Sequence, residues 1–217
     1  STRSESTPIT ASQAILKGLS DDGGLFVPTE LPKLDVSLEK LSGMTYREVA
    51  YEVMKLFLTD YTEEELEGCI AAAYDSKFDT PAIAPLRNVN GVEYMELFHG
   101  ATIAFKDMAL QLLPQLMSTA LKKTGEKDEV LILVATSGDT GKAALEGFRD
   151  VPQIRIMVFY PQGGVSRIQQ LQMLTQEGSN VNVTAVTGNF DDAQSGVKMI
   201  FSDKAFNEEL AKKGIRL

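Results

Sequence analysis

The sequence predicts an α/β fold built on a parallel sheet with helices on both faces, and three observations support this prediction. Three short runs are predicted strands: 129–136 and 154–160 have the near-continuous hydrophobicity of strands buried on both faces, and 181–186 is a third strand. A segment with helical periodicity follows each run. A glycine-rich turn, TSGDTG, joins the first run to its helix. This alternation of strands and helices predicts a three-layer unit in the second half of the chain.

The first half of the chain is predicted to be mostly helical. Segment 44–59 gives the clearest helix, because its apolar residues recur at the i, i+3, i+4 spacing. Thr45 and Glu48 form a capping box at its start, and Thr62 with Glu65 repeats the device before a second helix. We interpret the apolar faces of both helices as core.

Two prolines mark a boundary between the halves. Pro81 and Pro85 interrupt regular structure, and residues 88–91 (NVNG) have the composition of a hairpin turn. We therefore predict an N-terminal, mainly helical domain over residues 1–85 and an α/β region over residues 86–217.

Several helices are expected in the second region. Asp107 is predicted to cap a helix that runs to about residue 123 and is kinked at Pro114. The segments that follow the three strands are predicted to be helical over 142–149 and 165–177 and mostly helical over 191–213.

The composition argues against several classes of function. A net charge of −9 disfavours nucleic-acid binding, which requires a basic face. No apolar run approaches the roughly 20 residues of a membrane span, and no secretion signal opens the sequence, so we expect no membrane partner. The single cysteine, Cys69, can form no internal disulfide, which fits a cytoplasmic location. No His/Cys cluster has metal-ligand spacing, so we predict no metal site.

Residues 136–141 (TSGDTG) are expected at the carboxyl edge of the sheet, where open α/β sheets bind ligands. Ser137 and Thr140 offer hydroxyl groups, and the glycines allow backbone N–H groups to approach an anion at the positive end of the next helix. The motif has neither Walker nor G-x-G-x-x-G spacing. A plain tight turn would also explain it. Asp139 favours the ligand interpretation, because an acid within an anion cradle needs a partner of its own.

Residues 99–107 (HGATIAFKD) place Lys106 directly after an apolar Ile-Ala-Phe run. Two interpretations of this lysine are open from the residues alone. Its side chain extends out of a core to reach water, or it is kept in a pocket for chemistry.

Five stretches resemble the threonine synthase family: HGATIAFKD, VATSGDTGKAA, VFYPQGGVSRIQ, VTGNFDDAQSGVKMIF and, near the start, ILKGLSDDGGLFVPTELP. The resemblance covers essentially the whole chain, and the lysine motif combined with TSGDTG is highly specific. It implies the tryptophan synthase β-like fold (fold type II) of enzymes that use pyridoxal 5′-phosphate. It also implies conversion of O-phospho-L-homoserine and water to L-threonine and phosphate, the last step of threonine biosynthesis.

The chain departs from the family pattern in three ways. Ala101 stands where the family usually has proline, and Lys142 stands where a small residue is common, so that it adds charge near the cradle or points to solvent. Family members are also considerably longer. The glycine-rich loop that grips the cofactor phosphate is expected beyond Leu217, so the chain is expected to be an N-terminal part of such a protein.

The resemblance assigns roles to both motifs. It makes Lys106 the lysine that forms a Schiff base with the cofactor and then moves protons at Cα and Cβ of the substrate. An apolar setting would favour the neutral form of a lysine amine by lowering its pKa. It makes Asp139 the partner of the cofactor's ring hydroxyl. Substrate binding is assigned to Ser137, Gly138 and Thr140.

Two neighbours of the lysine have open roles. Phe105 packs beside the cofactor or fills the core. His99, the single histidine, contacts the substrate phosphate, orients the lysine loop or forms a structural hydrogen bond.

Two other functions stay open. The chain could belong to a threonine-synthase-like phospholyase that eliminates phosphate to give a 2-oxo acid, or it could be a catalytically silent fragment that acts as a scaffold. The expected partner of the enzyme is a small anionic substrate, and a monomer and a homodimer are both compatible with the sequence.

Overall fold

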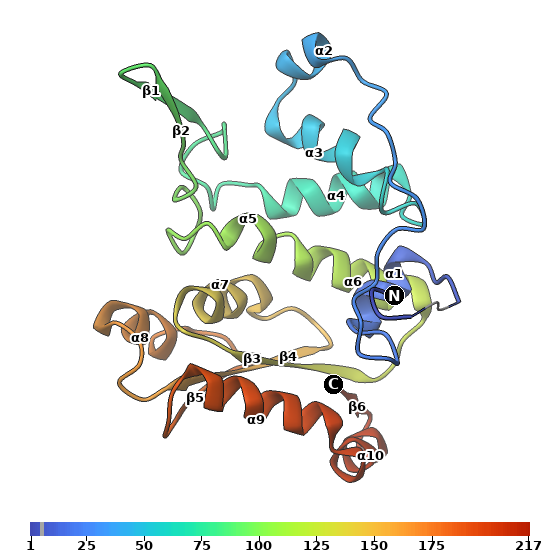
Figure 1. The fold of residues 1–217 in the computed structure, drawn as a ribbon, viewed down its shortest axis with the longest axis vertical. Helices are drawn as coiled ribbons and strands as arrows, with labels where there is room; N and C mark the ends of the chain where they lie inside the picture. The colour runs from blue at the N-terminus through green and yellow to red at the C-terminus, as the bar shows by residue number, and fades with distance from the viewer. Residues whose placement is uncertain (5–6) are drawn as a thin grey trace. The chain divides into compact units, whose positions relative to one another are not determined.

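A computed structural model describes residues 1–4 and 7–217 of the chain (Figure 1). By its internal contacts the chain divides into two compact units, which are described separately. Unit 1 comprises residues 1–96 and 115–126, and unit 2 comprises residues 97–114 and 127–217. The predicted domain boundary after residue 85 stays a prediction. Among the described residues, no helix is long and apolar enough to cross a membrane.

Unit 1 is helical apart from one hairpin. Its elements are α1 (Ala11–Lys17), α2 (Leu38–Ser42), α3 (Tyr46–Met54), α4 (Glu63–Ala73), most of α6 (Leu113–Thr124), β1 (Leu86–Val89) and β2 (Val92–Met95). Both predicted capping boxes are confirmed, at the starts of α3 and α4. The predicted helix over 44–59 ends early, at Met54, because the N–H groups of Leu56 and Phe57 bond three residues back instead of four.

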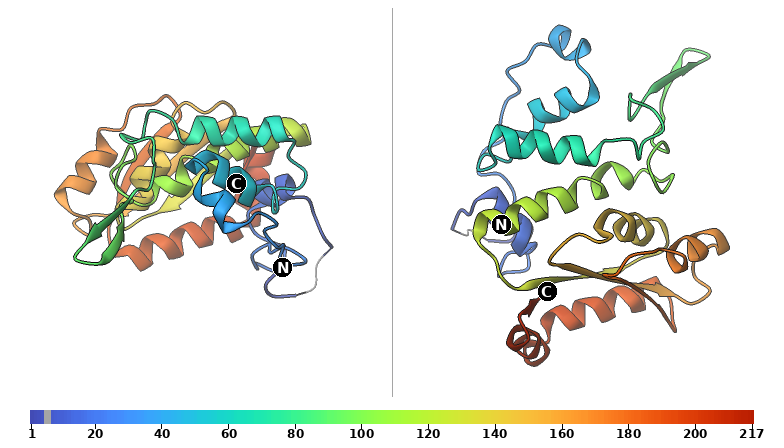
Figure 2. Two further views of the ribbon diagram at one scale, coloured as in Figure 1. Left: turned by 90° about the horizontal axis from the view of Figure 1, so that it is seen from above. Right: turned by 180° about the vertical axis from the view of Figure 1, so that it is seen from behind.

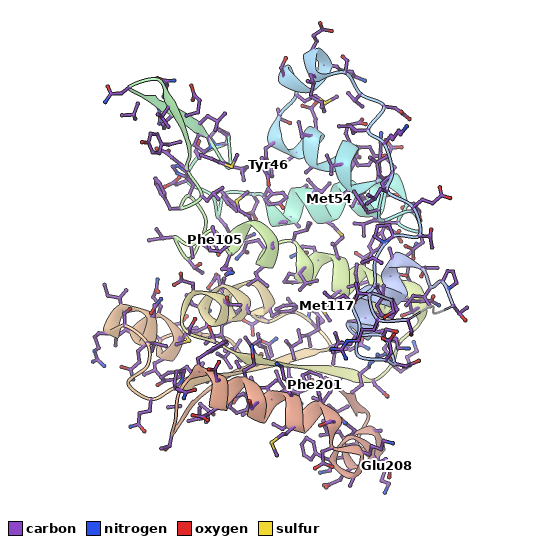
Figure 3. All side chains as sticks on the ribbon, viewed as in Figure 1. Tyr46, Met54, Phe105, Met117, Phe201 and Glu208 are labelled. Atoms are coloured by element: carbon purple, nitrogen blue, oxygen red, sulfur yellow. The ribbon has the colours of Figure 1, made fainter. Side chains whose placement is uncertain are left out.

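Helix α4 supplies much of the core of unit 1. The four apolar positions predicted for its inner face are all buried: Leu66, Cys69, Ile70 and Ala73. Burial raises the pKa of the Cys69 thiol. The hydroxyl group of Tyr61 donates a hydrogen bond of 2.9 Å to the carbonyl oxygen of Leu116, which ties the start of this helix to α6 near Met117 (Figure 3). The predicted core face of the second helix is therefore confirmed.

The predicted hairpin turn is also confirmed. Strands β1 and β2 pair antiparallel, and the two residues between them, Asn90 and Gly91, have φ angles of 53° and 81°. Positive φ at both central positions is the geometry of a type I′ turn, which matches the twist of the strands it joins.

Unit 2 contains the parallel sheet. Strands β3 (Glu129–Ala135), β4 (Ile154–Pro161) and β5 (Val181–Val186) match the three predicted apolar runs. The strand order is β5-β4-β3-β6, and every pairing is parallel. The edge strand β6 (Ile215–Arg216) was not predicted, because two residues carry no periodic pattern.

Helices cover both faces of this sheet. Helix α7 (Asp139–Phe148) packs on β4 with α8 (Arg167–Leu174) beside it, and α9 (Phe190–Ser202) covers β3 and β4 on the other face (Figures 1 and 2). Residues 191–213 are mostly helical, as predicted, and they form two helices. Asp203 has an extended backbone there, and its carboxylate accepts a 3.0 Å hydrogen bond from the N–H of Phe206, which begins α10 (Lys204–Lys212).

The lysine motif leads into a short helix, α5 (Asp107–Leu110), which packs against α7. The predicted helix over 107–123 with a kink at Pro114 is wrong, because α5 ends at Leu110 and α6 starts again at Leu113. Pro114 thus lies in the first turn of α6, where a missing N–H group breaks no helical bond.

One glycine allows α5 and α7 to meet. A Cβ atom added at Gly147 of α7 would lie 2.0 Å from the carbonyl oxygen of Leu110. Because this neighbour is a backbone atom, it cannot move aside as a flexible side chain would. The end of α5, the helix that follows the lysine, is therefore held against α7, the helix that follows the TSGDTG turn.

We predict that Gly147→Ala lowers the free energy of unfolding by about 1–3 kcal/mol, because overpacking forces the two helices apart. Gly196→Ala in α9 is the matched control. A Cβ atom there meets nothing within 4 Å, so this variant should be stabilised by up to about 1 kcal/mol through helix propensity. Urea unfolding of both variants tests the prediction, and equal effects would contradict it.

Candidate functional site

The TSGDTG turn lies at the carboxyl end of β3, as predicted. Strand β3 ends at Ala135 and α7 begins at Asp139, so the turn leaves the sheet within three residues. The N–H group of Thr136 still bonds to the carbonyl oxygen of Phe159 on β4, at 3.0 Å. The turn is thus anchored to two strands, and the positive end of α7 opens from the sheet edge.

The Thr136 hydroxyl group closes this turn. Its side chain is 1% exposed, and its Oγ1 atom accepts hydrogen bonds from the N–H groups of Gly138, at 3.0 Å, and Gly141, at 2.9 Å. The N–H groups of the two glycines therefore bond within the turn, so any N–H group that meets a ligand belongs to another residue of the motif. Sequence reasoning assigned no role to Thr136, whose one signal was its position as the first residue of the TSGDTG motif.

Three other N–H groups of the turn remain available. Those of Ser137, Asp139 and Thr140 have no hydrogen-bond partner within residues 1–4 and 7–217. Together with the helix N-terminus they form a set of donors suited to an anion. Gly138 contributes through its backbone, since its φ of 140° is one that other residues rarely adopt.

The Asp139 carboxylate has a partner that the sequence did not reveal. Its Oδ1 atom accepts a 2.8 Å hydrogen bond from Nε2 of Gln169, which lies in the first turn of α8. The Gln169 amide is therefore the group that holds the Asp139 carboxylate beside the anion cradle. The two residues are 30 positions apart, so no local pattern could have paired them.

A buried carboxylate holds the lysine loop. Asp107 is 0% exposed, and its two oxygens accept hydrogen bonds from the N–H and the hydroxyl groups of Thr102, both at 2.8 Å. A Cβ atom at Gly100 would lie 2.6 Å from the Asp107 carboxylate, so the loop closes tightly around it. The predicted helix-capping role is wrong: Lys106 occupies the N-cap position, and Asp107 turns back toward the loop.

The Lys106 amine is free of competing partners. Its Nζ atom lies 4.2 Å from the ring centroid of Phe105 and makes no ion pair or hydrogen bond with any residue that the structure describes. Phe105 is 55% exposed and Ile103 is 70% exposed, so the apolar run before the lysine forms a surface (Figure 3). The alternative in which Phe105 fills the core is therefore wrong.

The loop before the lysine is strained. Ile103 has a φ of 64°, a region that β-branched residues rarely occupy. Such a conformation costs about 1–3 kcal/mol and persists where the surroundings impose it. The buried Asp107–Thr102 pair supplies that constraint one residue away.

His99 lies at the start of the same loop. Its half-buried ring stacks on Phe98 with centroids 4.6 Å apart. Its predicted role in substrate binding stays a prediction. Lys142, by contrast, is turned away from the cradle: its Nζ atom lies 3.5 Å from the Glu146 carboxylate on the next turn of α7 and contacts the Gln176 amide.

The two motifs belong to neighbouring helices. The lysine precedes α5, the TSGDTG turn precedes α7, and these helices pack together and begin at the same end of unit 2 (Figure 1). The described residues contain no group of three side chains that could ligate a metal.

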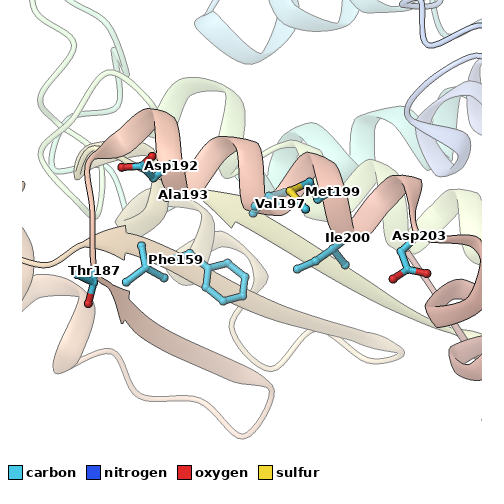
Figure 4. Close-up of a pocket in the computed structure, with 10 residues that line it drawn as sticks. Phe159, Thr187, Asp192, Ala193, Val197, Met199, Ile200 and Asp203 are labelled. Atoms are coloured by element: carbon cyan, nitrogen blue, oxygen red, sulfur yellow. The ribbon is translucent and has the colours of Figure 1, made fainter.

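A separate hollow of about 480 Å³ lies along α9, between this helix and the ends of β4 and β5 (Figure 4). Its walls are mainly apolar. Its two acids, Asp192 and Asp203, accept hydrogen bonds from backbone N–H groups at the starts of α9 and α10. The hollow contains none of the predicted site residues, so we place the candidate site at the starts of α5 and α7.

The chain is similar to known proteins of one family. Residues 1–74 match the family described as threonine synthase N terminus. The chain is 41% identical to threonine synthase of Schizosaccharomyces pombe, covering 96% of this chain and 42% of that protein. It is 42% identical to threonine synthase of Pseudomonas aeruginosa, covering 95% of this chain and 44% of that protein. The chain thus spans less than half the length of these relatives.

A solved structure gives the same result for the fold. The crystal structure of threonine synthase from Brucella melitensis with bound pyridoxal phosphate superimposes with a TM-score of 0.85 at 39% identity. The match covers 97% of this chain and 45% of that chain. The predicted fold class, a helical N-terminal region followed by a parallel-sheet unit of the tryptophan synthase β-like type, is confirmed.

We predict that Thr136→Val lowers the free energy of unfolding by about 1–3 kcal/mol, because it leaves two N–H groups of the turn without their acceptor. Thr136→Ser retains the hydroxyl group and should lose less. Chemical denaturation measures both. Equal losses in the two variants would show that the methyl group, and not the hydroxyl group, stabilises the turn.

Proposed function

We propose that this chain, a member of the threonine synthase family over the N-terminal part that it spans, carries the reactive lysine and the substrate cradle of a pyridoxal-phosphate-dependent threonine synthase. The reaction is conversion of O-phospho-L-homoserine and water to L-threonine and phosphate. One observation supports the proposal above all others. Lys106, on a loop locked by the buried Asp107, has no competing partner for its amine among the described residues.

The residues present fit the cofactor. Pyridoxal phosphate supplies, when bound, an aldehyde that a lysine can attack and a ring that accepts electrons from the substrate. An amine held in an ion pair would be a poor nucleophile, and Lys106 forms none with the residues that the structure describes. Phe105 leaves an exposed aromatic face beside that amine, suited to flanking a planar ring.

Lys106 is proposed to carry protons as well. A single amine can remove a proton from substrate Cα and, once it has given that proton up, a second proton from Cβ, provided that it stays within hydrogen-bond reach of both atoms. The Asp107–Thr102 lock restricts the loop that carries it. The lysine stem can then move while its backbone does not.

The turn at the start of α7 is proposed to hold the substrate carboxylate. Its available donors are the N–H groups of Ser137, Asp139 and Thr140. The hydroxyl groups of Ser137, which is exposed, and Thr140, which is half-buried, lie in the same turn. Gly138 permits this geometry through its φ of 140° and not through its N–H group. Asp139 is proposed to face the cofactor's ring hydroxyl, and His99 to contact substrate phosphate.

The setting of the enzyme follows from the same proposal. A small anionic substrate suits the cradle, and a net charge of −9 over the sequence is opposed to nucleic-acid binding. Cys69, the single cysteine of the sequence, is buried and free, which fits a cytoplasmic location.

We predict that Lys106→Ala abolishes the visible absorbance that pyridoxal phosphate acquires on binding to a lysine, and lowers turnover at least about a hundredfold. Lys106→Arg is the matched control for charge, since it keeps a cation beside Phe105 but cannot bond to the aldehyde. Both variants should fail equally. Titration of the full-length protein with the cofactor, followed at visible wavelengths, measures this absorbance. An unchanged spectrum in Lys106→Ala would contradict the proposal.

The product identifies the reaction. With phosphohomoserine as substrate, threonine and phosphate should form in equal amounts. Release of 2-oxobutyrate and ammonia in place of threonine would instead identify a phospholyase. Absence of any cofactor absorbance in the wild-type protein would favour the silent scaffold.

A further inference from the structure

We propose that Gln169 is a positioning residue for this reaction: it holds the Asp139 carboxylate in place so that its second oxygen can meet the cofactor. The inference rests on the proposed function. It concerns a residue on α8, outside both sequence motifs that carry the chemistry.

The Gln169 amide is held at both ends. Its Nε2 atom donates to Oδ1 of Asp139 at 2.8 Å, while its Oε1 atom accepts from the N–H group of Ser166 at 3.0 Å. Reversing the amide would set an oxygen against the carboxylate and an NH₂ group against an N–H group. Both contacts would be repulsive, so the network fixes a single orientation.

The backbone of the turn makes room for this amide. A Cβ atom at Gly138 would lie 2.4 Å from Cδ of Gln169, so any side chain at position 138 would displace it. Gly138 thus serves two purposes, its positive φ and the close approach of α8. The side chain of Gln169 thereby spans from the start of α8 to the start of α7.

The choice of an amide has an electrostatic consequence. A neutral donor orients the carboxylate without forming an ion pair, so Asp139 keeps its full charge for a ligand. Its Oδ2 atom accepts no hydrogen bond from the described part of the chain. Gln169 therefore holds the Oδ1 atom of Asp139, and the Oδ2 atom is available to a ligand.

A simpler explanation must be separated from this one. Gln169 and Ser166 form a capping box, which by itself would justify a glutamine at this position. Glutamate serves a capping box equally well, because its carboxylate also accepts from the N–H group of Ser166. Toward Asp139, however, glutamate offers no donor and adds a like charge.

Gln169→Glu therefore distinguishes the two roles. In the full-length protein, we expect its dissociation constant for pyridoxal phosphate, measured by visible absorbance, to rise about tenfold or more. Ser166→Ala is the control, since it removes the cap hydroxyl and leaves the Asp139 contact; its cofactor affinity should match the wild type within about threefold.

A paired exchange provides the rescue. In Asp139→Asn combined with Gln169→Glu, donor and acceptor trade places and the hydrogen bond can form again. We expect this double variant to bind the cofactor more tightly than Gln169→Glu alone. A purely structural role predicts no such rescue, since the capping box is intact in both proteins.

The outcomes separate the two proposals. Wild-type affinity in Gln169→Glu, with the absorbance lost in Lys106→Ala, overturns the role of Gln169 and leaves the proposed function standing. Absence of the absorbance in the wild-type protein overturns both. Weakened affinity in Gln169→Glu without rescue in the double variant overturns the hydrogen-bond explanation.

Discussion

The carboxylate of Asp107 is fully buried, and the lysine motif is arranged around it. Burying a charge is costly unless hydrogen bonds replace its water, and here the N–H and hydroxyl groups of Thr102 do so. These bonds pull residues 100–107 into a closed loop that has no room for a side chain at Gly100. The same closure forces Ile103 into a strained backbone conformation, and the Lys106 amine has no competing partner within residues 1–4 and 7–217.

A second constraint joins this loop to the rest of unit 2. Helix α5 approaches α7 closely at Gly147, so the lysine loop is tied to the helix that begins at the TSGDTG turn. The Thr136 hydroxyl group closes that turn by accepting hydrogen bonds from the N–H groups of Gly138 and Gly141. Three further N–H groups of the turn have no partner among the described residues and are available to a ligand. The geometry of the site therefore depends on two buried side chains, Asp107 and Thr136, that are not proposed to touch the substrate.

Local signals in the sequence were reliable where the structure is locally determined. The capping boxes of α3 and α4, the type I′ hairpin and the three apolar strands were all predicted, because each depends on neighbouring residues or on one clear periodicity. Predictions failed where a side chain had two possible partners. Asp107 could cap a helix or close a loop, and its carboxylate bonds to Thr102 of the loop instead of capping α5.

The sequence by itself determined the fold class, the lysine motif and the TSGDTG turn, since these are written in consecutive residues. Only the tertiary structure decided which N–H groups of the turn are available, that Phe105 is exposed, and that Gln169 bonds to Asp139. The physical reason is distance along the chain. Hydrogen bonds between residues 30 positions apart, and the exposure of a side chain, depend on how helices pack on the sheet, which no local pattern specifies.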